Sequence, residues 1–112
     1  CELLELDVSS NALSALPVGI GDLEELQRLR LSENQLSGLP EEVSGMTMLT
    51  ELDLRGNSLL GLPASIGELQ GLQDLDLRSN CLHGLPDSIC DLSQLQFLRL
   101  TNNRLSELPE KF

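Results

Sequence analysis

Two residue types recur at one constant interval, which limits the possible folds more than any other feature of the chain. An asparagine series and a proline series each have five members spaced 23 residues apart. The series are Asn11, Asn34, Asn57, Asn80 and Asn103, and Pro17, Pro40, Pro63, Pro86 and Pro109. A fixed period of this length is typical of a solenoid, in which similar units stack along one axis. The sequence therefore predicts one repeat domain over residues 1–112.

The repeating unit begins with a short strand pattern. Written as LxxLxLxxNxLxxLPxx(I/V)xx(L/M)xx, its copies start near Leu3, Leu26, Leu49, Leu72 and Leu95. The alternation of leucine with polar residues before the asparagine has the period of two expected of a strand with one buried face. Because each return of the chain follows the same path, the strands should lie parallel. The asparagine side chains should then stack as a ladder that bonds backbone groups where the strands end.

The segment after each proline should be short and helix-like. Proline fixes φ and fits a turn or the first position of a helix. An apolar residue follows three positions later, Ile or Val in most units and Phe112 in the last, and forms one apolar face with the next Leu or Met. A segment this short forms no stable helix alone, so we expect 3₁₀ turns or irregular structure. These features together predict an α/β solenoid with a parallel sheet on one face and short helical segments on the other.

The unit resembles a known family. The Leu-Pro-x-x-Ile-Gly-x-Leu stretch from Leu62 to Leu69, within a 23-residue unit, is similar to the leucine-rich repeats of cytoplasmic proteins. The resemblance is strongest to LAP scaffolds such as Scribble and Erbin, and it extends to Ras-suppressor-like proteins, plant intracellular Ras-group proteins and Roco GTPases. It covers the entire chain, with small departures at Val8, Val43 and Met46. It implies a right-handed arc that binds another protein on a concave parallel sheet.

Charge and composition disfavour several classes of partner and location. The 18 acidic residues exceed the 7 basic ones and give a net charge of −11, which disfavours nucleic acid and anionic membrane surfaces. No apolar run approaches the roughly 20 residues of a membrane-spanning helix, and no stretch resembles a secretory signal. Cys1, Cys81 and Cys90 are odd in number and lack a paired spacing. We therefore expect free thiols and a cytoplasmic location.

Both ends of the array keep the apolar core pattern. This pattern continues into the terminal units at Leu3, Leu6 and Val8 and at Leu98, Leu100, Leu105 and Leu108. Terminal repeats usually carry a polar outer face, and an uncovered end exposes apolar surface and an unpaired strand edge. We therefore expect that the chain is a piece of a longer protein, or that its copies associate end to end.

The variable residues between the leucines are the candidates for recognition. In the unit LxxLxLxxN, the third and fifth positions should face out of the sheet, and the seventh and eighth should lie at its rim. Five of the 7 basic residues and seven of the 18 acidic ones fall in these columns. The sheet face should therefore be nearly neutral while the rest of the chain is strongly acidic. Basic residues are concentrated where we expect a partner to bind.

The first candidate group is a set of carboxylates with two arginines nearby. Its members are Glu51, Asp53, Asp74 and Asp76 on two neighbouring strands, with Arg55 and Arg78 one step along the chain. Like charges side by side cost stability unless a counter-charge offsets them. The group is either a docking site for a Lys- or Arg-bearing segment or a set of solvated ion pairs, each contributing about 0–1 kcal/mol.

The second candidate group is aromatic and basic. It joins Phe97 with Arg99 and Arg78, and it extends toward Arg55. Aromatic and arginine residues are enriched among interface hot spots. The alternative is that Phe97 packs on a further repeat or on the aliphatic stem of Arg99.

No arrangement of residues predicts an enzyme or a cofactor site. His83 is the only histidine, and it lies two residues from Cys81 without a third group to orient a base. The cysteines and this histidine lack a zinc-site spacing, and the carboxylates lack a calcium-loop spacing. We therefore expect neither a metal nor another cofactor.

Three hypotheses for function remain open. The first is a non-catalytic scaffold or signalling module that binds a protein partner, one with a basic segment, on its concave face. The second is the regulatory region of a multidomain signalling enzyme such as a Roco-type GTPase. The third is an architectural spacer without a partner of its own.

Overall fold

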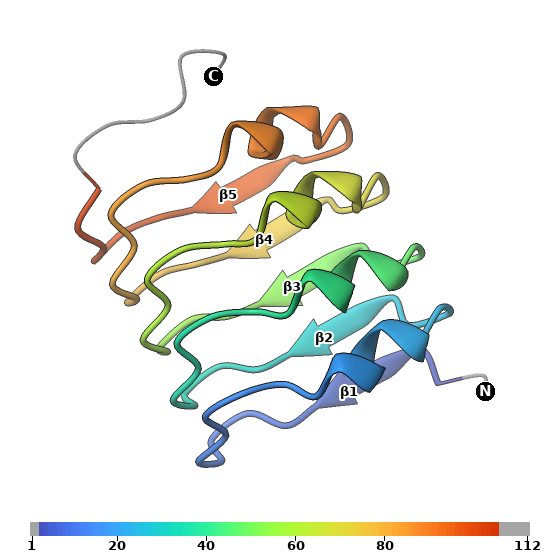
Figure 1. The fold of residues 1–112 in the computed structure, drawn as a ribbon, viewed down its shortest axis with the longest axis horizontal. Coiled ribbons are helices and arrows are strands. Elements are labelled where there is room, and N and C mark those ends of the chain that lie inside the picture. The colour runs from blue at the N-terminus through green and yellow to red at the C-terminus, as the bar shows by residue number, and fades with distance from the viewer. Residues whose placement is uncertain (1–2, 106–112) are drawn as a thin grey trace.

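A computed structural model describes residues 3–105 as a stack of similar turns of chain with two layers (Figure 1). One layer is a five-stranded parallel sheet in the order β1-β2-β3-β4-β5. Its strands β1 to β5 are Glu5–Asp7, Arg28–Arg30, Glu51–Asp53, Asp74–Asp76 and Phe97–Arg99. The 3₁₀ helices of the other layer, η1 to η4, are Val18–Asp22, Glu41–Gly45, Ala64–Glu68 and Asp87–Asp91. The predicted solenoid of parallel strands and short helical segments is confirmed.

Neighbouring strands pair at the period of the sequence. Leu29 of β2 lies between Leu6 of β1 and Leu52 of β3. The series continues with Leu75 of β4 and Leu98 of β5. Each residue therefore lies beside the equivalent residue of the next repeat. β1 and β5 form the two edges of this sheet.

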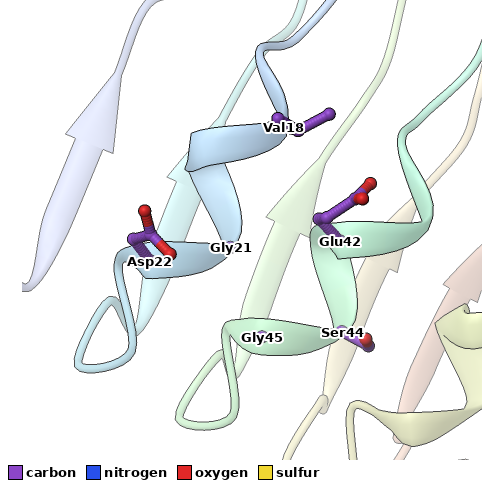
Figure 2. A pocket seen from close by; sticks show the side chains of 6 residues that line it. All are labelled: Val18, Gly21, Asp22, Glu42, Ser44 and Gly45. Atoms are coloured by element: carbon purple, nitrogen blue, oxygen red, sulfur yellow. The ribbon is translucent and has the colours of Figure 1, made fainter.

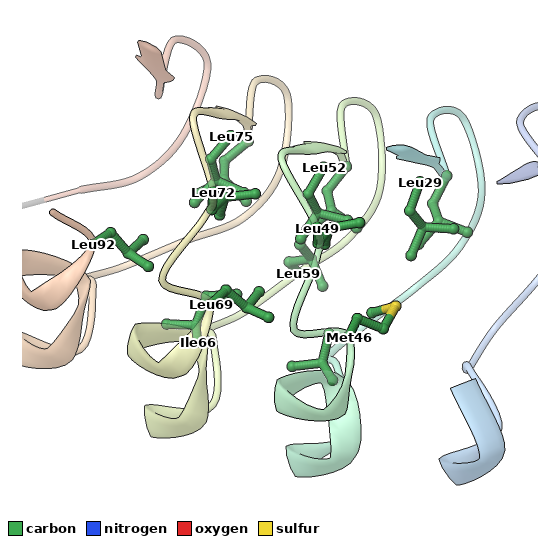
Figure 3. Close-up of a cluster of buried hydrophobic side chains, with 14 of the residues drawn as sticks. Leu29, Met46, Leu49, Leu52, Leu59, Ile66, Leu69, Leu72, Leu75 and Leu92 are labelled. Atoms are coloured by element: carbon green, nitrogen blue, oxygen red, sulfur yellow. The ribbon is translucent and has the colours of Figure 1, made fainter. Parts of the chain in front are cut away.

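The core lies between the sheet and the 3₁₀ helices (Figure 3). It is filled by leucines of the strands and connecting segments and by one isoleucine or valine from each helix. Leu29, Leu52 and Leu75 are at most 1% exposed, which confirms that the strand leucines point inward. Leu6 and Leu98, in the same column, are only half-buried. The difference arises because the terminal strands have a neighbouring repeat on one side only.

Proline starts the 3₁₀ helices as the sequence predicts. Pro40 has extended geometry, with φ −71° and ψ 152°, and its carbonyl oxygen accepts a hydrogen bond of 3.1 Å from the backbone N–H of Val43. This single turn buries Val43 completely against the core. Pro109 and Phe112, at the equivalent positions of the fifth unit, lie outside the described residues. Within residues 3–105, no helix is both long and apolar enough to cross a membrane.

Glycine allows the backbones of adjacent 3₁₀ helices to approach closely. A Cβ atom on Gly67 of η3 would lie 2.5 Å from the carbonyl oxygen of Ser88 in η4, which is too close for any side chain. The sequence predicts only that such glycines mark outer turns. The structure shows that Gly67 is also a packing residue.

The predicted asparagine ladder is present, and it joins each repeat to the one before it. The Nδ2 of Asn57 donates to the carbonyl oxygens of Leu54 in its own repeat, at 2.9 Å, and of Leu31 in the preceding repeat, at 3.0 Å. Its Oδ1 accepts from the backbone N–H of Leu36 at 3.1 Å. The same three types of contact are made by Asn34, Asn80 and Asn103.

A left-handed backbone residue precedes the asparagine in each repeat. The φ angle is +74° at Gly56 and +57° at Ser79, and Ser10, Glu33 and Asn102 share this conformation. The sequence analysis missed this feature. The available signal was the occurrence of glycine and asparagine in one column, since both types adopt this conformation more readily than others.

Candidate functional site

The surface of the sheet that faces away from the core holds the predicted site residues. We call this surface the sheet face and define it by the first and third residues of β1–β5 and the residue two positions after each strand. It includes Glu51, Asp53, Arg55, Asp74, Asp76, Arg78, Phe97 and Arg99, all on β3–β5 or just after β3 and β4. The parallel register brings these eight residues into one continuous area.

Arginines of β2 offset the charge of Glu51. Arg28 lies 3.5 Å from carboxylate oxygens of both Glu5 and Glu51, and Arg30 lies 3.5 Å and 3.7 Å from the same two carboxylates. These side chains are partly exposed, so each pair contributes at most about 1 kcal/mol. Glu51 thus belongs to a quartet of alternating charges that includes neither Arg55 nor Arg78.

Arg78 folds back over Asp76. Its Nε and Nη2 donate to Oδ1 and Oδ2 of Asp76 at 2.9 Å and 2.7 Å, and its backbone N–H donates to Oδ1 at 3.1 Å. Burial alone would raise the pKa of the Asp76 carboxyl, but these hydrogen bonds from Arg78 hold it below its ordinary value. Asp76 is only 7% exposed although it belongs to the sheet face. The expectation that Arg78 offsets the carboxylates is confirmed.

Arg99 links Asp74 to Phe97. Its Nη1 donates to Oδ1 of Asp74 at 2.8 Å, and its guanidinium carbon lies 5.2 Å from the centre of the Phe97 ring. A cation at this distance from a ring face is attracted to it. Phe97 nevertheless remains 53% exposed, so this contact leaves much of the ring open to solvent.

Asp53 and Arg55 occupy the positions of Asp76 and Arg78 one repeat earlier, yet their side chains do not pair. Asp53 accepts one hydrogen bond of 3.1 Å from the backbone N–H of Arg55. Burial raises the pKa of the Asp53 carboxyl, and the charge of Asp76 acts in the same direction. Neither Asp53 nor Arg55 forms an ion pair with another residue of the range 3–105. One carboxylate of the predicted group thus lacks an ion-pair partner within that range.

A structural role of the aspartates was missed by the sequence analysis. Asp7, Asp53 and Asp76 each accept a hydrogen bond from the backbone N–H two residues later, at 3.0–3.1 Å. Aspartate commonly closes turns in this way. The recurrence of aspartate at one position of the unit, directly after a strand leucine, could have indicated this role from the sequence.

Replacement of the two neighbouring aspartates should have opposite effects on stability. At pH 7, Asp76→Asn is expected to lower the free energy of unfolding by about 1–2 kcal/mol, because it breaks the charge-assisted bonds to the partly exposed Arg78. Asp53→Asn should raise the free energy of unfolding slightly, because it removes a poorly solvated charge and keeps the acceptor for Arg55 N–H. Urea denaturation of both variants measures the two changes.

The pH dependence of these variants follows from the direction of each pKa shift. The lowered pKa of Asp76 means that its ionised form stabilises the fold above the unfolded pKa, and this contribution is lost as pH falls through the folded pKa. The raised pKa of Asp53 means that its ionised form costs stability as pH rises from the unfolded to the folded pKa. If both substitutions changed the free energy of unfolding in the same direction at pH 7, the opposite roles assigned to the two carboxylates would be contradicted.

The cysteines and the histidine do not form a joint site. Cys81 and Cys90 are free thiols in half-buried positions, and His83 is exposed. Cys1 lies outside the described residues. Within residues 3–105, no group of three or more His, Cys, Asp or Glu side chains is arranged to hold a metal ion.

A shallow hollow of about 280 Å³ lies between η1 and η2 (Figure 2). It is lined by Val18, Gly21, Asp22, Glu42, Ser44 and Gly45. The hollow lies on the helical layer, away from the sheet face, and contains none of the predicted site residues. Its charged side chains are the two carboxylates, which offer no counter-charge to one another. The sheet face therefore remains the candidate site.

Comparison with known proteins places the chain among repeat proteins. A family model described as Leucine rich repeat matches residues 1–59 and 49–105. Comparison with curated protein sequences gives no significant match. One similar solved structure is that of a leucine-rich repeat protein of Leptospira interrogans. It is 40% identical in sequence, with a TM-score of 0.95, over 97% of this chain and 28% of that one.

Two Arabidopsis thaliana structures are also similar. A chain of the BIR3–SERK2 complex is 35% identical, with a TM-score of 0.87, over 99% of this chain and 62% of that one. The ectodomain of the receptor kinase SOBIR1 is 34% identical, with a TM-score of 0.80, over 96% of this chain and 60% of that one. The chain thus spans less than two thirds of the length of each of these structures.

Proposed function

Because the chain belongs to the leucine-rich repeat family, we propose that it is a non-catalytic module that binds a protein partner through its sheet face. Among the similar structures, one chain comes from a complex between two proteins, BIR3 and SERK2. The proposal for this chain depends on its own sheet face.

The observation that carries the proposal is the uneven pairing of charges on the sheet face. Ion pairs satisfy the quartet on β1–β3 and also Asp74 and Asp76. Between and beside these pairs lie Asp53 and Arg55, without ion pairs in the described range, and the half-exposed ring of Phe97. A half-exposed aromatic ring and an exposed arginine beside satisfied polar groups have the composition of an interface hot spot.

The chemistry of this area defines the partner that it fits. Asp53 suits a Lys or Arg side chain of the partner, and Arg55 suits a carboxylate beside it. The apolar part of the partner would cover Phe97. Because parallel strands and the asparagine ladder fix the backbone, little ordering is needed on binding. A preformed surface of this kind suits a scaffold in a signalling assembly.

The cellular location is part of the proposal. Cys81 and Cys90 are free and half-buried, in positions that give the fold no cross-link. Free thiols of this kind persist in a reducing compartment. We therefore propose that the chain acts in the cytoplasm.

A second candidate function has one observation in its favour. The similar SOBIR1 structure is the ectodomain of a receptor kinase. An array like this one can thus be one region of a signalling enzyme, and a regulatory role in a larger enzyme such as a GTPase is the alternative. A nucleotide-binding loop in the flanking sequence of the polypeptide would favour this alternative.

A pair of matched variants tests the use of the sheet face. The site variant combines Arg55→Glu with Phe97→Ser, and the control variant combines Glu42→Lys with Val18→Ser on the helical layer. Each variant reverses one exposed charge and removes one exposed apolar side chain. Proteins retained from a lysate by the immobilised wild-type chain and by the control, but not by the site variant, are candidate partners.

The affinity of each purified candidate partner for the wild-type chain and for the two variants then tests whether the partner binds the sheet face. The site variant should bind at least about 30-fold more weakly than the wild-type chain, which corresponds to a hot-spot loss of about 2 kcal/mol or more. The control should bind with wild-type affinity. Equal binding by the site variant would refute the proposal, and failure of the correctly folded wild-type chain to retain any protein would favour the spacer hypothesis.

A further inference from the structure

The sequence Asp-Leu-Arg occurs at residues 53–55 and 76–78, and only the second copy holds a guanidinium on its aspartate. We propose that Asp53 is the binding site for an arginine side chain of the partner, which takes the place over Asp53 that Arg78 takes over Asp76. This inference rests on the proposed function, since it concerns how a partner protein is recognised on the sheet face. It narrows the basic residue of the partner from lysine or arginine to arginine.

The first argument is that both carboxylates are held by the same backbone contact. Oδ1 of Asp53 accepts from the N–H of Arg55 at 3.1 Å, and Oδ1 of Asp76 accepts from the N–H of Arg78 at 3.1 Å. The two aspartates are also register partners in β3 and β4. Arg78 bonds Asp76 through Nε at 2.9 Å and Nη2 at 2.7 Å. These bonds therefore show from which side a guanidinium would approach Asp53.

The second argument is that Asp53 lacks a counter-charge. Arg30 of β2 and Asp76 of β4 flank it in the sheet. Arg30 lies near two glutamates of β1 and β3 instead. Burial raises the pKa of the Asp53 carboxyl, and the charge of Asp76 acts in the same direction. A cation from a partner would offset this poorly stabilised charge.

The position of Asp53 in the stack makes this argument independent of the ends of the chain. Asp53 lies on β3, which pairs with β2 on one side and β4 on the other. Both neighbouring repeats belong to the described residues. The groups that flank Asp53 in the sheet are therefore the ones present here, whatever sequence precedes or follows the array.

The third argument concerns the type of cation. A planar guanidinium presents two parallel N–H donors to one carboxylate, whereas a lysine ammonium acts as a point charge. Arg78 is bound in the first manner, and its side chain is still 39% exposed, so a guanidinium in this position is accessible from solvent. Arg55 is exposed and forms no ion pair within residues 3–105, which leaves the equivalent place over Asp53 open.

Two small probes test the site without a protein partner. N-acetyl-arginine amide and N-acetyl-lysine amide carry the same charge and no carboxylate, so they alter the ionic strength equally. NMR follows the side-chain carboxyl carbon of Asp53 and the backbone N–H of Arg55 while each probe is added. The arginine probe should shift both signals to saturation and bind about threefold or more tightly than the lysine probe. Equal responses to the two probes, or none, would overturn the proposal.

Single substitutions locate the binding, and the backbone amide spectrum shows whether each variant is folded. Asp53→Asn keeps an acceptor for the N–H of Arg55 but removes the charge, so this N–H should no longer respond to the arginine probe. A response that persists would place the binding elsewhere and refute the site. Tighter binding of the arginine probe by Arg55→Ala would show that Arg55 closes over Asp53 in solution, which would contradict an open site.

Arg78→Ala tests the equivalence of the two aspartates by opening the second one. In the wild-type chain Arg78 occupies Asp76, so the carboxyl carbon of Asp76 should not follow the arginine probe to saturation. In the folded Arg78→Ala variant it should respond as Asp53 does. A folded variant in which Asp76 does not respond would refute the inference that Asp53 binds a guanidinium in the manner of Asp76.

The result can be separated from that of the partner experiment. Retention of a protein through the sheet face, without any preference of Asp53 for the arginine probe, would refute this inference and leave the proposed function intact. A preference for the arginine probe, with no protein retained by the folded wild-type chain, would refute the proposed function and leave the guanidinium site at Asp53.

Discussion

Asn57→Ala is expected to lower the free energy of unfolding by about 3 kcal/mol or more, because alanine leaves buried groups without partners. The side chain of Asn57, in a residue only 7% exposed, bonds the carbonyl oxygens of Leu31 and Leu54 and the N–H of Leu36. Each buried group left unpaired costs about 1–3 kcal/mol. The replacement also removes a connection between two repeats, and a solenoid is stabilised largely by such connections.

Asn11→Ala provides the matched control for this experiment. Asn11 has the same position in its repeat, but it is exposed and bonds carbonyl oxygens of its own repeat. Its replacement should change the free energy of unfolding by less than about 1 kcal/mol. Urea denaturation of the two variants measures both values. Equal losses in the two variants would show that bonding between repeats is not what makes the asparagine important.

Leu52→Ala is expected to lower the free energy of unfolding by about 3 kcal/mol, within the range of about 2–5 kcal/mol for buried leucines. Leu52 is 1% exposed and lies between Leu29 and Leu75 of the adjacent strands. Removing its side chain leaves a cavity at the middle of the stack, where the repeats on both sides contribute walls and collapse is difficult.

Leu98→Ala tests whether position in the stack determines this cost. Leu98 occupies the same column in β5 but is half-buried, with Leu75 on one side only. Its replacement should cost about 1–2 kcal/mol, because less surface was buried and water can reach the site. A loss at Leu98 as large as that at Leu52 would contradict the inference that each repeat is stabilised by its two neighbours.

The location of the candidate site could be predicted from the sequence, but its pairing could not. The period places Asp53, Arg55, Asp76 and Arg78 on one surface, and the structure confirms this placement. The tripeptide Asp-Leu-Arg at residues 53–55 is identical to that at residues 76–78. Yet only the second forms a bidentate ion pair. A local pattern cannot distinguish the two, since the charges of other repeats contribute to the field around each aspartate.

Partners distant in the sequence decide most of the charge pairing. Asp74 is bonded by Arg99, 25 residues later, and Glu51 lies near Arg28 and Arg30 of the preceding strand. Sequence analysis names the residues that share a column but not which neighbour each long side chain reaches. The expected pairing of Arg55 with the carboxylate group is therefore absent from residues 3–105, although that of Arg78 is present.

The amino-acid sequence by itself determined the solenoid, the parallel register, the inward leucines and the asparagine ladder. It did so because a constant spacing of 23 residues allows each strand to pair with the equivalent residues of the next. Only the tertiary structure decided that Asp76 is buried, that the side chains of Asp53 and Arg55 form no ion pair, and that the residue before each asparagine is left-handed. These features depend on distances of a few ångströms between side chains and backbone of neighbouring repeats, which no spacing along one chain specifies.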